Sequence, residues 1–286
     1  MAKALIIGCG PAGVSAAIYL VRAGVDTTII YRDGGALLKA DKIENYYGFV
    51  EPISGKDLVE RGIEQAKRLG VKFLQDQVVG LGYAETGLAV ETTAGTHQAE
   101  VVIIATGTQR MAPKLEGLAR LEGKGVSYCA VCDAFFYRGK NVAVFGTGEY
   151  ALHEVQALAD VAGKVFLLTD GKEPTCAFPE NVTIDRRRIA ELEGTETLES
   201  VRFDDGERVL VSGFFVAVGV AGSADLAHKV GAETAGTRIV VDENMATFVP
   251  GLYAAGDCTG GMLQIAKAVC DGAQAAQSAI KYLRTR

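Results

Sequence analysis

The chain has 286 residues, enough for two domains of ordinary size, each with a core of its own. Its formal charge is −6, from 29 basic and 35 acidic residues, and so gives no broad basic field of the kind that binds nucleic-acid phosphates. No apolar run approaches the roughly 20 residues of a membrane-spanning helix. We therefore expect a cytoplasmic protein without nucleic-acid or membrane partners.

Residues 4–31 predict a strand, a glycine-rich turn, a helix and a second strand, which together form a βαβ unit. Gly8, Gly10 and Gly13 match the dinucleotide fingerprint. One glycine allows the tight turn, one the approach of a pyrophosphate, and one the close packing of helix on strand. This context predicts dinucleotide binding, with the phosphates at the helix N-terminus.

The same pattern returns at residues 141–169, which indicates an internal duplication. Each copy has a late apolar strand ending in glycine, at 101–107 and 213–219, and a hairpin, around Thr86-Gly87 and Asp205-Gly206. A strand at 249–257 returns to the first copy, and an alanine-rich helix follows from about Leu263 to Leu283. We expect an α/β fold of two Rossmann-like nucleotide-binding domains, the second inserted in the first. The expected ranges are 1–108, 109–238 and 239–286.

Six cysteines are too few for a disulfide scaffold, and only Cys129 and Cys132 form a spaced pair. His97, His153 and His228 lack ligand spacing to that pair, so we expect no metal site, and we expect His153 and His228 on helix surfaces. The pair favours redox chemistry.

Several motifs now combine: the first fingerprint, "ATG" at 105–107, "CAVCDAFFYRGKNVAVFG" at 129–146 and "GLYAAGD" at 251–257. Together they resemble the low-molecular-weight thioredoxin reductases, from the first strand to the last helix. The resemblance implies a homodimer, FAD in the first domain and a redox disulfide in the inserted domain. It also implies a large rotation of the domains between flavin reduction and disulfide exchange.

By this resemblance, Cys132 faces the flavin, Cys129 attacks the disulfide of thioredoxin, and Asp133 is the acid–base residue. The chemistry requires a thiolate nucleophile, a neighbouring thiol to resolve the mixed disulfide, and a carboxyl group to move protons.

The resemblance also assigns the FAD site. Asn45 belongs to it, Asp257 is expected at the ribityl chain, and Gln264 and Ile265 beside the ring. Asp33 is either a ribose ligand or part of a solvated turn. The chain departs from the family pattern at Ala36, which replaces a glutamine, and at Leu263, which replaces an arginine. The full set of expected FAD residues is Gly8, Gly10, Pro11, Ala12, Gly13, Asp33, Gly35, Ala36, Leu37, Asn45, Ala105, Thr106, Gly107, Gly256, Asp257, Gln264 and Ile265.

The second fingerprint, "GTGEYA" at 146–151, departs from the NADPH pattern. Tyr150 is bulky where relatives have small residues, and Thr169-Asp170-Gly171 replaces the arginines that hold a 2′-phosphate, so NADPH is disfavoured. Asp170 is placed to bind the ribose of NADH, which is one interpretation. The other is electron donation by ferredoxin, as in the ferredoxin-dependent flavin thioredoxin reductases.

The separate departures from the NADPH-binding pattern favour ferredoxin as the electron donor. Arg186–Arg188 form either a docking patch for ferredoxin or a solvated loop. We therefore expect an FAD-dependent thioredoxin-disulfide reductase, with NADH as the alternative donor. The alternative without catalysis is a flavin redox sensor, against which the intact Cys129, Cys132 and Asp133 argue.

Overall fold

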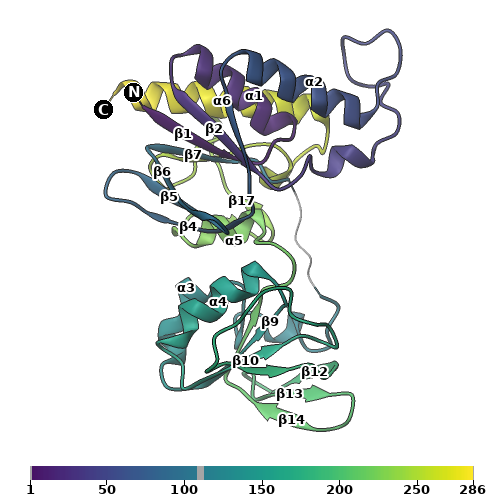
Figure 1. Ribbon diagram of the computed structural model, residues 1–286, viewed down its shortest axis with the longest axis vertical. Helices are drawn as coiled ribbons and strands as arrows, with labels where there is room; N and C mark the ends of the chain where they lie inside the picture. Colours follow the sequence, from purple (N-terminus) through teal and green to yellow (C-terminus); the bar gives the residue numbers. More distant parts are fainter. Residues whose placement is uncertain (1, 108–112, 286) are drawn as a thin grey trace. The chain divides into compact units, whose positions relative to one another are not determined.

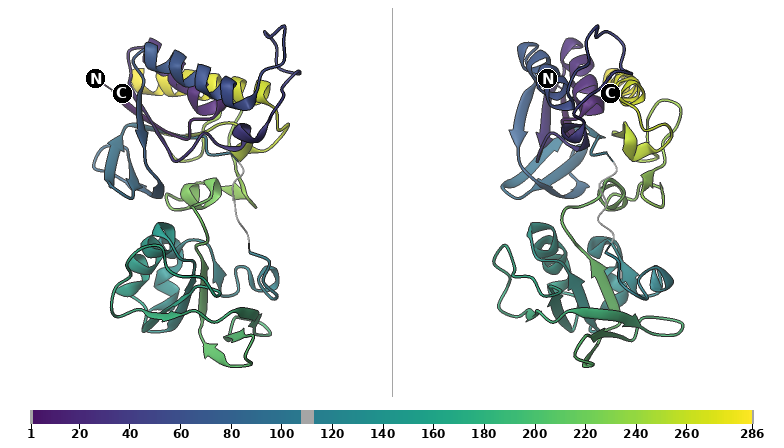
Figure 2. Two further views of the ribbon diagram at one scale, coloured as in Figure 1. Left: turned by 45° about the vertical axis from the view of Figure 1, so that its right-hand side comes forward. Right: turned by 90° about the vertical axis from the view of Figure 1, so that its right-hand side faces the viewer.

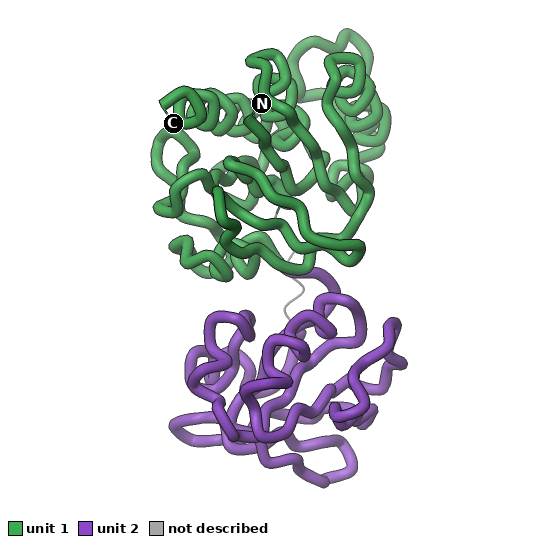
Figure 3. Tube along the Cα trace, turned by 60° about the vertical axis from the view of Figure 1, so that its left-hand side comes forward, with its two compact units in different colours: residues 1–110, 222–286 green, residues 111–221 purple. Residues whose placement is uncertain are grey.

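A computed structural model describes residues 2–107 and 113–285. The chain divides into two compact units, coloured green and purple in Figure 3. Unit 1 consists of residues 1–110 and 222–286, and unit 2 of residues 111–221. Each unit is built around its own five-stranded parallel sheet. The expected α/β fold with two Rossmann-like domains is confirmed.

The sheet of unit 1 has the strand order β18-β7-β1-β2-β3, and all neighbouring strands are parallel. Runs of Ile, Leu and Val fill the strand centres, as is typical of parallel strands covered on both faces. Ile6 pairs with Ile29 and Ile103 on its two neighbours, and all three side chains are fully buried. The strands are β1 (Lys3–Ile7), β2 (Asp26–Tyr31), β3 (Lys72–Gln75), β7 (Val101–Ile104) and β18 (Leu252–Ala254).

Three helices cover one face of this sheet, and an antiparallel three-stranded sheet lies on the other (Figures 1 and 2). The helices are α1 (Pro11–Arg22), α2 (Gly55–Arg68) and α6 (Ile265–Arg284). The strands are β4 (Val78–Tyr83), β5 (Leu88–Thr92) and β6 (Gly95–Ala99). Within residues 2–107 and 113–285, no helix has both the length and the apolar character needed to cross a membrane.

Helices α1 and α6 cross closely because small residues meet at the crossing. A Cβ added to Gly272 would lie 2.1 Å from the carbonyl oxygen of Ala12. Nearby, Ser15 Oγ donates a 2.7 Å hydrogen bond to the carbonyl oxygen of Val269. This crossing fixes the start of α1, and with it the first fingerprint, against the start of α6.

Unit 2 repeats the same plan, with the strand order β11-β10-β9-β15-β8. Its parallel strands are β8 (Val126–Ser127), β9 (Asn141–Phe145), β10 (Lys164–Leu168), β11 (Thr183–Asp185) and β15 (Gly213–Val216). Helix α4 (Glu149–Ala159) follows β9 as α1 follows β1. An antiparallel sheet of β12 (Ile189–Glu193), β13 (Ser200–Phe203) and β14 (Arg208–Leu210) completes the unit. The short helix α3 (Ala130–Asp133) and the 3₁₀ turn η3 (Ala134–Tyr137) precede β9.

The C-terminal boundary expected for the inserted domain, at residue 238, is wrong, because residues 222–238 belong to unit 1. They form α5 (Ser223–His228), β16 (Thr234–Ala235) and most of the β-hairpin with β17 (Arg238–Ile239). Ser223 Oγ donates to the carbonyl oxygen of Gly107 at 3.1 Å, and Tyr83 Oη donates to that of Val230 at 2.7 Å. These contacts are distant in sequence, so no local pattern could place the boundary.

Candidate active site

The first fingerprint connects β1 to α1 and combines two crowded glycines with an open one. A Cβ on Gly8 would lie 2.4 Å from the carbonyl oxygen of Ala105, and one on Gly13 would lie 2.0 Å from that of Gly8. Gly8 also has a φ of +109°, a conformation that favours glycine. At Gly10, by contrast, a Cβ would have no neighbour within 4 Å. The turn is therefore tightly packed inside and open where a phosphate would approach.

The other strand ends of unit 1 meet at this turn. Ala105 N donates to the carbonyl oxygen of Ile7 at 2.8 Å, which puts the "ATG" segment beside the fingerprint. Gly256 has a φ of +85°, and a Cβ there would lie 2.9 Å from Cβ of Ala12. The structure thus brings together the expected residues that follow β1, β7 and β18. Thr106 Oγ1 lies in this cluster, buried and without a hydrogen-bond partner.

The segment after β2 also joins this cluster. Asp33 accepts a 2.8 Å hydrogen bond from Gly35 N, and its carbonyl oxygen accepts one from Cys9 Sγ at 3.3 Å. Partial burial alone raises the pKa of Asp33, but the Gly35 hydrogen bond and the Arg32 guanidinium outweigh it and hold that pKa below its usual value. Asp33 is therefore ionised at neutral pH at the end of β2. The 3₁₀ turn η1 (Ala36–Lys39) contains Ala36 and Leu37.

Asn45 and Gln264 are 219 residues apart in sequence, yet Asn45 Nδ2 donates to Gln264 Oε1 at 3.0 Å. Gln264 precedes α6, so Ile265 begins that helix. Asp257 begins the 3₁₀ turn η4 (Asp257–Thr259), and Lys267 of α6 holds this turn. Lys267 Nζ donates to the carbonyl oxygens of Gly256, at 2.9 Å, and Gly260, at 2.6 Å.

This geometry fits FAD. Gly10 leaves room at a helix N-terminus, where backbone N–H groups favour a pyrophosphate. The buried hydroxyl of Thr106 lacks a partner in a cluster of turn residues, as expected beside a group that completes its hydrogen bonding. Asp33 and Asp257 offer carboxylates for ribose and ribityl hydroxyls.

In unit 2, Cys129 and Cys132 form a disulfide, with their Cα atoms 5.4 Å apart. Cys132 N donates to Cys129 Sγ at 3.2 Å, so the short helix α3 begins on the disulfide itself. Cys129 is 6% exposed, whereas Cys132 is exposed. Asp133 follows directly, half-buried. Burial, reinforced by the charge of Asp133, raises the pKa of Tyr137.

Helix α4 holds the segment that carries the disulfide through two side chains that the sequence did not single out as a pair. Tyr150 Oη donates to the carbonyl oxygen of Tyr128 at 3.0 Å, and Glu154 Oε2 accepts from Ala130 N at 2.5 Å. Both side chains are 1% exposed. A signal was present: four residues apart, they lie on one helical face together with the apolar Val155 and Leu158.

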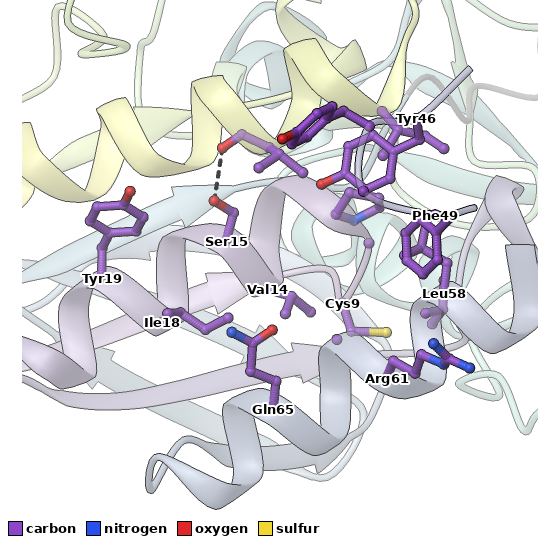
Figure 4. Close-up of a pocket in the computed structure, with 18 residues that line it drawn as sticks. Cys9, Val14, Ser15, Ile18, Tyr19, Tyr46, Phe49, Leu58, Arg61 and Gln65 are labelled. Carbon is purple, nitrogen blue, oxygen red and sulfur yellow. Dashed lines mark hydrogen bonds between the residues drawn. The ribbon is translucent and has the colours of Figure 1, made fainter. Parts of the chain in front are cut away.

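A cavity of about 480 Å³ in unit 1 lies between α1, α2, α6 and the loop at 46–49 (Figure 4). Val14, Ile18 and Val269 give it apolar walls, and Tyr46 and Phe49 stand at one end. Cys9 reaches it from the fingerprint, and burial, with the charge of Asp33, raises the pKa of that thiol to about 11.

Comparisons with known proteins show the family of the chain. The model of the pyridine nucleotide-disulphide oxidoreductase family matches residues 2–275. The chain is similar to the thioredoxin reductase of Aquifex aeolicus, with 35% identity over 98% of this chain and 92% of that protein.

Two solved structures are similar over almost their whole length. The atypical thioredoxin reductase TRi of Desulfovibrio vulgaris Hildenborough is 41% identical, with a TM-score of 0.93 over 100% of this chain and 99% of that one. A ferredoxin-flavin thioredoxin reductase of Clostridium acetobutylicum is 31% identical, with a TM-score of 0.70 over 99% and 98%. The chain belongs to the pyridine nucleotide-disulphide oxidoreductase family and, within it, to the FAD-containing thioredoxin reductases.

Proposed function

We propose that this thioredoxin reductase takes its electrons from reduced ferredoxin rather than from a nicotinamide nucleotide. The observation that carries the proposal is a contrast between equivalent glycines of the two fingerprints. A Cβ on Gly10 would meet nothing within 4 Å, whereas one on Gly148 would lie 3.1 Å from Thr175 Oγ1. Thr175 N donates to the carbonyl oxygen of Thr147 at 2.7 Å. A loop of unit 2 thus lies against its own fingerprint, where a pyrophosphate would have to approach.

The charges at this fingerprint support the same conclusion. Glu149 stands in the first turn of α4, where a carboxylate repels a phosphate. Asp170, the candidate ribose ligand, has a φ of +52°, and its Oδ1 accepts a 2.9 Å hydrogen bond from Ile189 N. Because one oxygen is engaged with the backbone, Asp170 has a structural role that explains its presence. The similar C. acetobutylicum protein is named for ferredoxin.

Arg186–Arg188 give ferredoxin less support as a docking patch. Arg186 pairs with Glu173 at 3.0 Å and Arg187 with Asp185 at 2.6 Å. These neighbouring carboxylates offset much of the positive charge, which favours the solvated-loop interpretation.

For the disulfide chemistry, we propose the roles that the resemblance implies. FAD, when bound, would supply the redox chemistry that links the electron donor to the disulfide. The Cys129 thiolate attacks a sulfur of the thioredoxin disulfide and forms a mixed disulfide. The Cys132 thiolate then attacks Cys129 Sγ, which re-forms the internal disulfide and releases thioredoxin as a dithiol. Asp133, adjacent in sequence and half-buried, takes the proton that the Cys132 thiol releases and donates it to the leaving thiolate of thioredoxin.

Thioredoxin would dock on the exposed apolar side chains that surround the disulfide. Val131, Phe135 and Phe136 are 55%, 74% and 66% exposed. Arg138 lies 5.8 Å from the centre of the Phe135 ring. Large exposed apolar side chains grouped around a reactive centre favour a protein substrate over a small molecule.

An anaerobic titration of the oxidised holoenzyme tests the donor. Reduced ferredoxin, NADH and NADPH are added in turn, and loss of the visible flavin absorbance is followed. We expect bleaching by ferredoxin alone. Bleaching by NADH or NADPH at comparable concentrations contradicts the proposal.

NADH is the second candidate, and one observation favours it. Thr169 Oγ1, beside Asp170 at the end of β10, is buried without a hydrogen-bond partner, as Thr106 Oγ1 is in unit 1. A ribose at this edge would satisfy it. If NADH is the donor, Asp170→Ala weakens NADH binding and leaves FAD retention unchanged.

We also propose that the enzyme is a homodimer joined through the face formed by α1, α2 and the loop at 46–50. Tyr47 and Val50 there are 98% and 100% exposed, and Tyr19 of α1 is 41% exposed. The apolar cavity of Figure 4 opens beside them. Such a group of exposed apolar side chains is typical of an interface between subunits.

A further inference from the structure

The buried carboxylate of Glu154 contacts the backbone between the two cysteines of the redox disulfide. Its Oε2 accepts the 2.5 Å hydrogen bond from Ala130 N, the amide that follows Cys129. Glu154 is 1% exposed and belongs to α4. Cys129 directly precedes α3, and Cys132 lies within that helix. An acidic side chain at such a place is costly to bury, so its retention calls for a function.

Because Ala130 N donates this hydrogen bond to Glu154, it is not available to stabilise a thiolate at Cys129. Backbone N–H groups next to a cysteine are the donors that stabilise its thiolate. Cys132 N points at Cys129 Sγ, at 3.2 Å, but Ala130 N is engaged by the Glu154 carboxylate. A thiolate at Cys129 would therefore have one donor fewer and a negative charge close by in a buried setting.

We propose that Glu154 is a positioning residue that makes the Cys129–Cys132 dithiol a stronger reductant, by disfavouring the thiolate form of its reduced state. A dithiol whose thiolate is stabilised is a weaker reductant. A dithiol whose thiolate is destabilised is a stronger reductant of a substrate disulfide. Reduction of the disulfide takes up two electrons. It takes up two protons where both sulfurs end as thiols, and one where Cys129 ends as a thiolate. The inference rests on the proposed redox role of this cysteine pair.

Tyr150 fixes the backbone on the other side of Cys129 and adds no charge there. Its hydroxyl donates to the carbonyl oxygen of Tyr128, one residue before Cys129. Together, Tyr150 and Glu154 fix the backbone on both sides of Cys129 from a single face of α4. The chain therefore offers two anchors, one neutral and one charged, whose effects can be separated.

Titratable side chains reach Glu154 from both sides. His153 Nδ1 lies 3.3 Å from Glu154 Oε1, and the pair is ionic when the imidazole is protonated. The titratable groups of the disulfide segment next to Ala130 are Tyr128, Cys129, Cys132 and Asp133, and Tyr150 and His153 belong to α4 with Glu154. Because a cysteine thiolate forms only as pH rises, the Glu154 charge acts on Cys129 most strongly at alkaline pH.

The test is the equilibrium of the disulfide with dithiothreitol redox buffers, read by alkylation and mass spectrometry of the Cys129–Cys132 peptide, from about pH 6 to about pH 9. In Glu154→Gln the amide oxygen still accepts from Ala130 N, but the charge is gone. We expect equal constants for wild type and Glu154→Gln at the acidic end. At the alkaline end we expect about a tenfold shift toward the dithiol in the variant, about 30 mV for this two-electron couple.

Two matched variants isolate the charge. Glu149→Gln removes an exposed carboxylate from the same helix, and Tyr150→Phe removes the neutral anchor; both should follow the pH dependence of wild type. A shift of Glu154→Gln that is equal at every pH, no shift, or an equal shift in Glu149→Gln overturns the inference. A wild-type disulfide that does not exchange reversibly overturns the proposed redox role itself.

If Glu154→Gln does not fold, the wild-type protein still provides a test. The rate of alkylation of Cys129 in the reduced protein is measured against pH, and we expect an apparent pKa above the value of about 8.5 for a free thiol. A lower value contradicts the inference.

Discussion

The two cysteines of the disulfide differ in exposure, so which of them attacks the thioredoxin disulfide can be tested. Cys132 is exposed and Cys129 is 6% exposed, although Cys129 is the proposed nucleophile toward thioredoxin. We expect Cys132→Ser, which retains Cys129, to accumulate a stable mixed disulfide with thioredoxin, because the resolving thiol is missing. Cys129→Ser should retain FAD, lose turnover and form no such adduct. Non-reducing gel electrophoresis with mass spectrometry reads the adduct, and an adduct in Cys129→Ser alone reverses the roles.

Cys258 couples stability to pH. Burial raises the pKa of this thiol from 9.0 to about 12. Between these values the unfolded chain releases the proton and the folded protein keeps it, so the free energy of unfolding falls as pH rises through 9. The fall for this group is up to about 1.4 kcal/mol per pH unit.

Urea unfolding from about pH 8 to about pH 10.5 measures this loss of stability. Cys258→Ala should be less stable at the lower pH, because a buried sulfur is removed, but its stability should decline less steeply. Equal slopes for the variant and wild type would exclude Cys258 as the source.

The sequence predicted residues whose role is local and missed those whose role depends on another segment. The fingerprint glycines follow from backbone requirements within six residues, such as the φ of +109° at Gly8, whereas the close approach of Gly8 to Ala105 involves another segment. Tyr150 was interpreted only as an obstacle to phosphate, yet its hydroxyl contacts Tyr128. His228 is exposed as expected, but the side chain of His153 is only 17% exposed, next to the buried Glu154. Periodicity alone does not show what packs on a helix.

At the scale of elements, the strands and helices that the sequence predicted agree with those of the structure, whereas α2 (Gly55–Arg68) was not predicted. The predicted helix from about Leu263 to Leu283 is α6, Ile265–Arg284, and the predicted hairpins are β4–β5 and β13–β14. These elements have strong periodicity and clear turn residues. The resemblance assigned Asn45 and Gln264 to one site but did not predict the hydrogen bond between them, because no sequence pattern spans 219 residues.

The turn η4 is held to α6 by hydrogen bonds of Lys267 and Asp271, which form an ion pair within that helix. Lys267 Nζ lies 2.7 Å from Asp271 Oδ2, and the side chains are 19% and 8% exposed. Lys267→Met would leave the Asp271 carboxylate buried without this partner and free the carbonyl oxygens of Gly256 and Gly260. We expect the free energy of unfolding to fall by about 3 kcal/mol.

The same substitution should weaken FAD binding, because η4 carries Asp257. Urea unfolding of the apoprotein and fluorescence titration with FAD measure the two effects separately. The double variant Lys267→Met/Asp271→Asn, whose neutral amide oxygen still accepts from Gly256 N, should recover part of the stability. Unchanged FAD affinity in Lys267→Met would show that Asp257 is positioned without the ion pair.

At the scale of the whole molecule, the duplication explains why two similar units have different tasks. The sheets share the order β7-β1-β2-β3 and β15-β9-β10-β11, and each central strand leads into a fingerprint. In unit 1 the fingerprint is open at Gly10, whereas in unit 2 the equivalent helix α4 holds the disulfide segment. The same βαβ plan therefore presents a cofactor site in one unit and a disulfide in the other.

The cytoplasmic location stays a prediction.

The proposed homodimer can be tested by placing a charge on the face that would be buried. Tyr19 lines the apolar cavity from α1, so Tyr19→Glu would bury an unpaired carboxylate in the interface. We expect wild type to sediment with twice the mass of one chain, and Tyr19→Glu to sediment as a monomer at micromolar concentration. Leu210→Glu is the matched control, since Leu210 is 70% exposed on β14 of unit 2, and it should remain dimeric. Retained FAD absorbance shows that each variant is folded. A monomeric wild type, or a dimeric Tyr19→Glu, would place the contact between subunits elsewhere or remove it altogether.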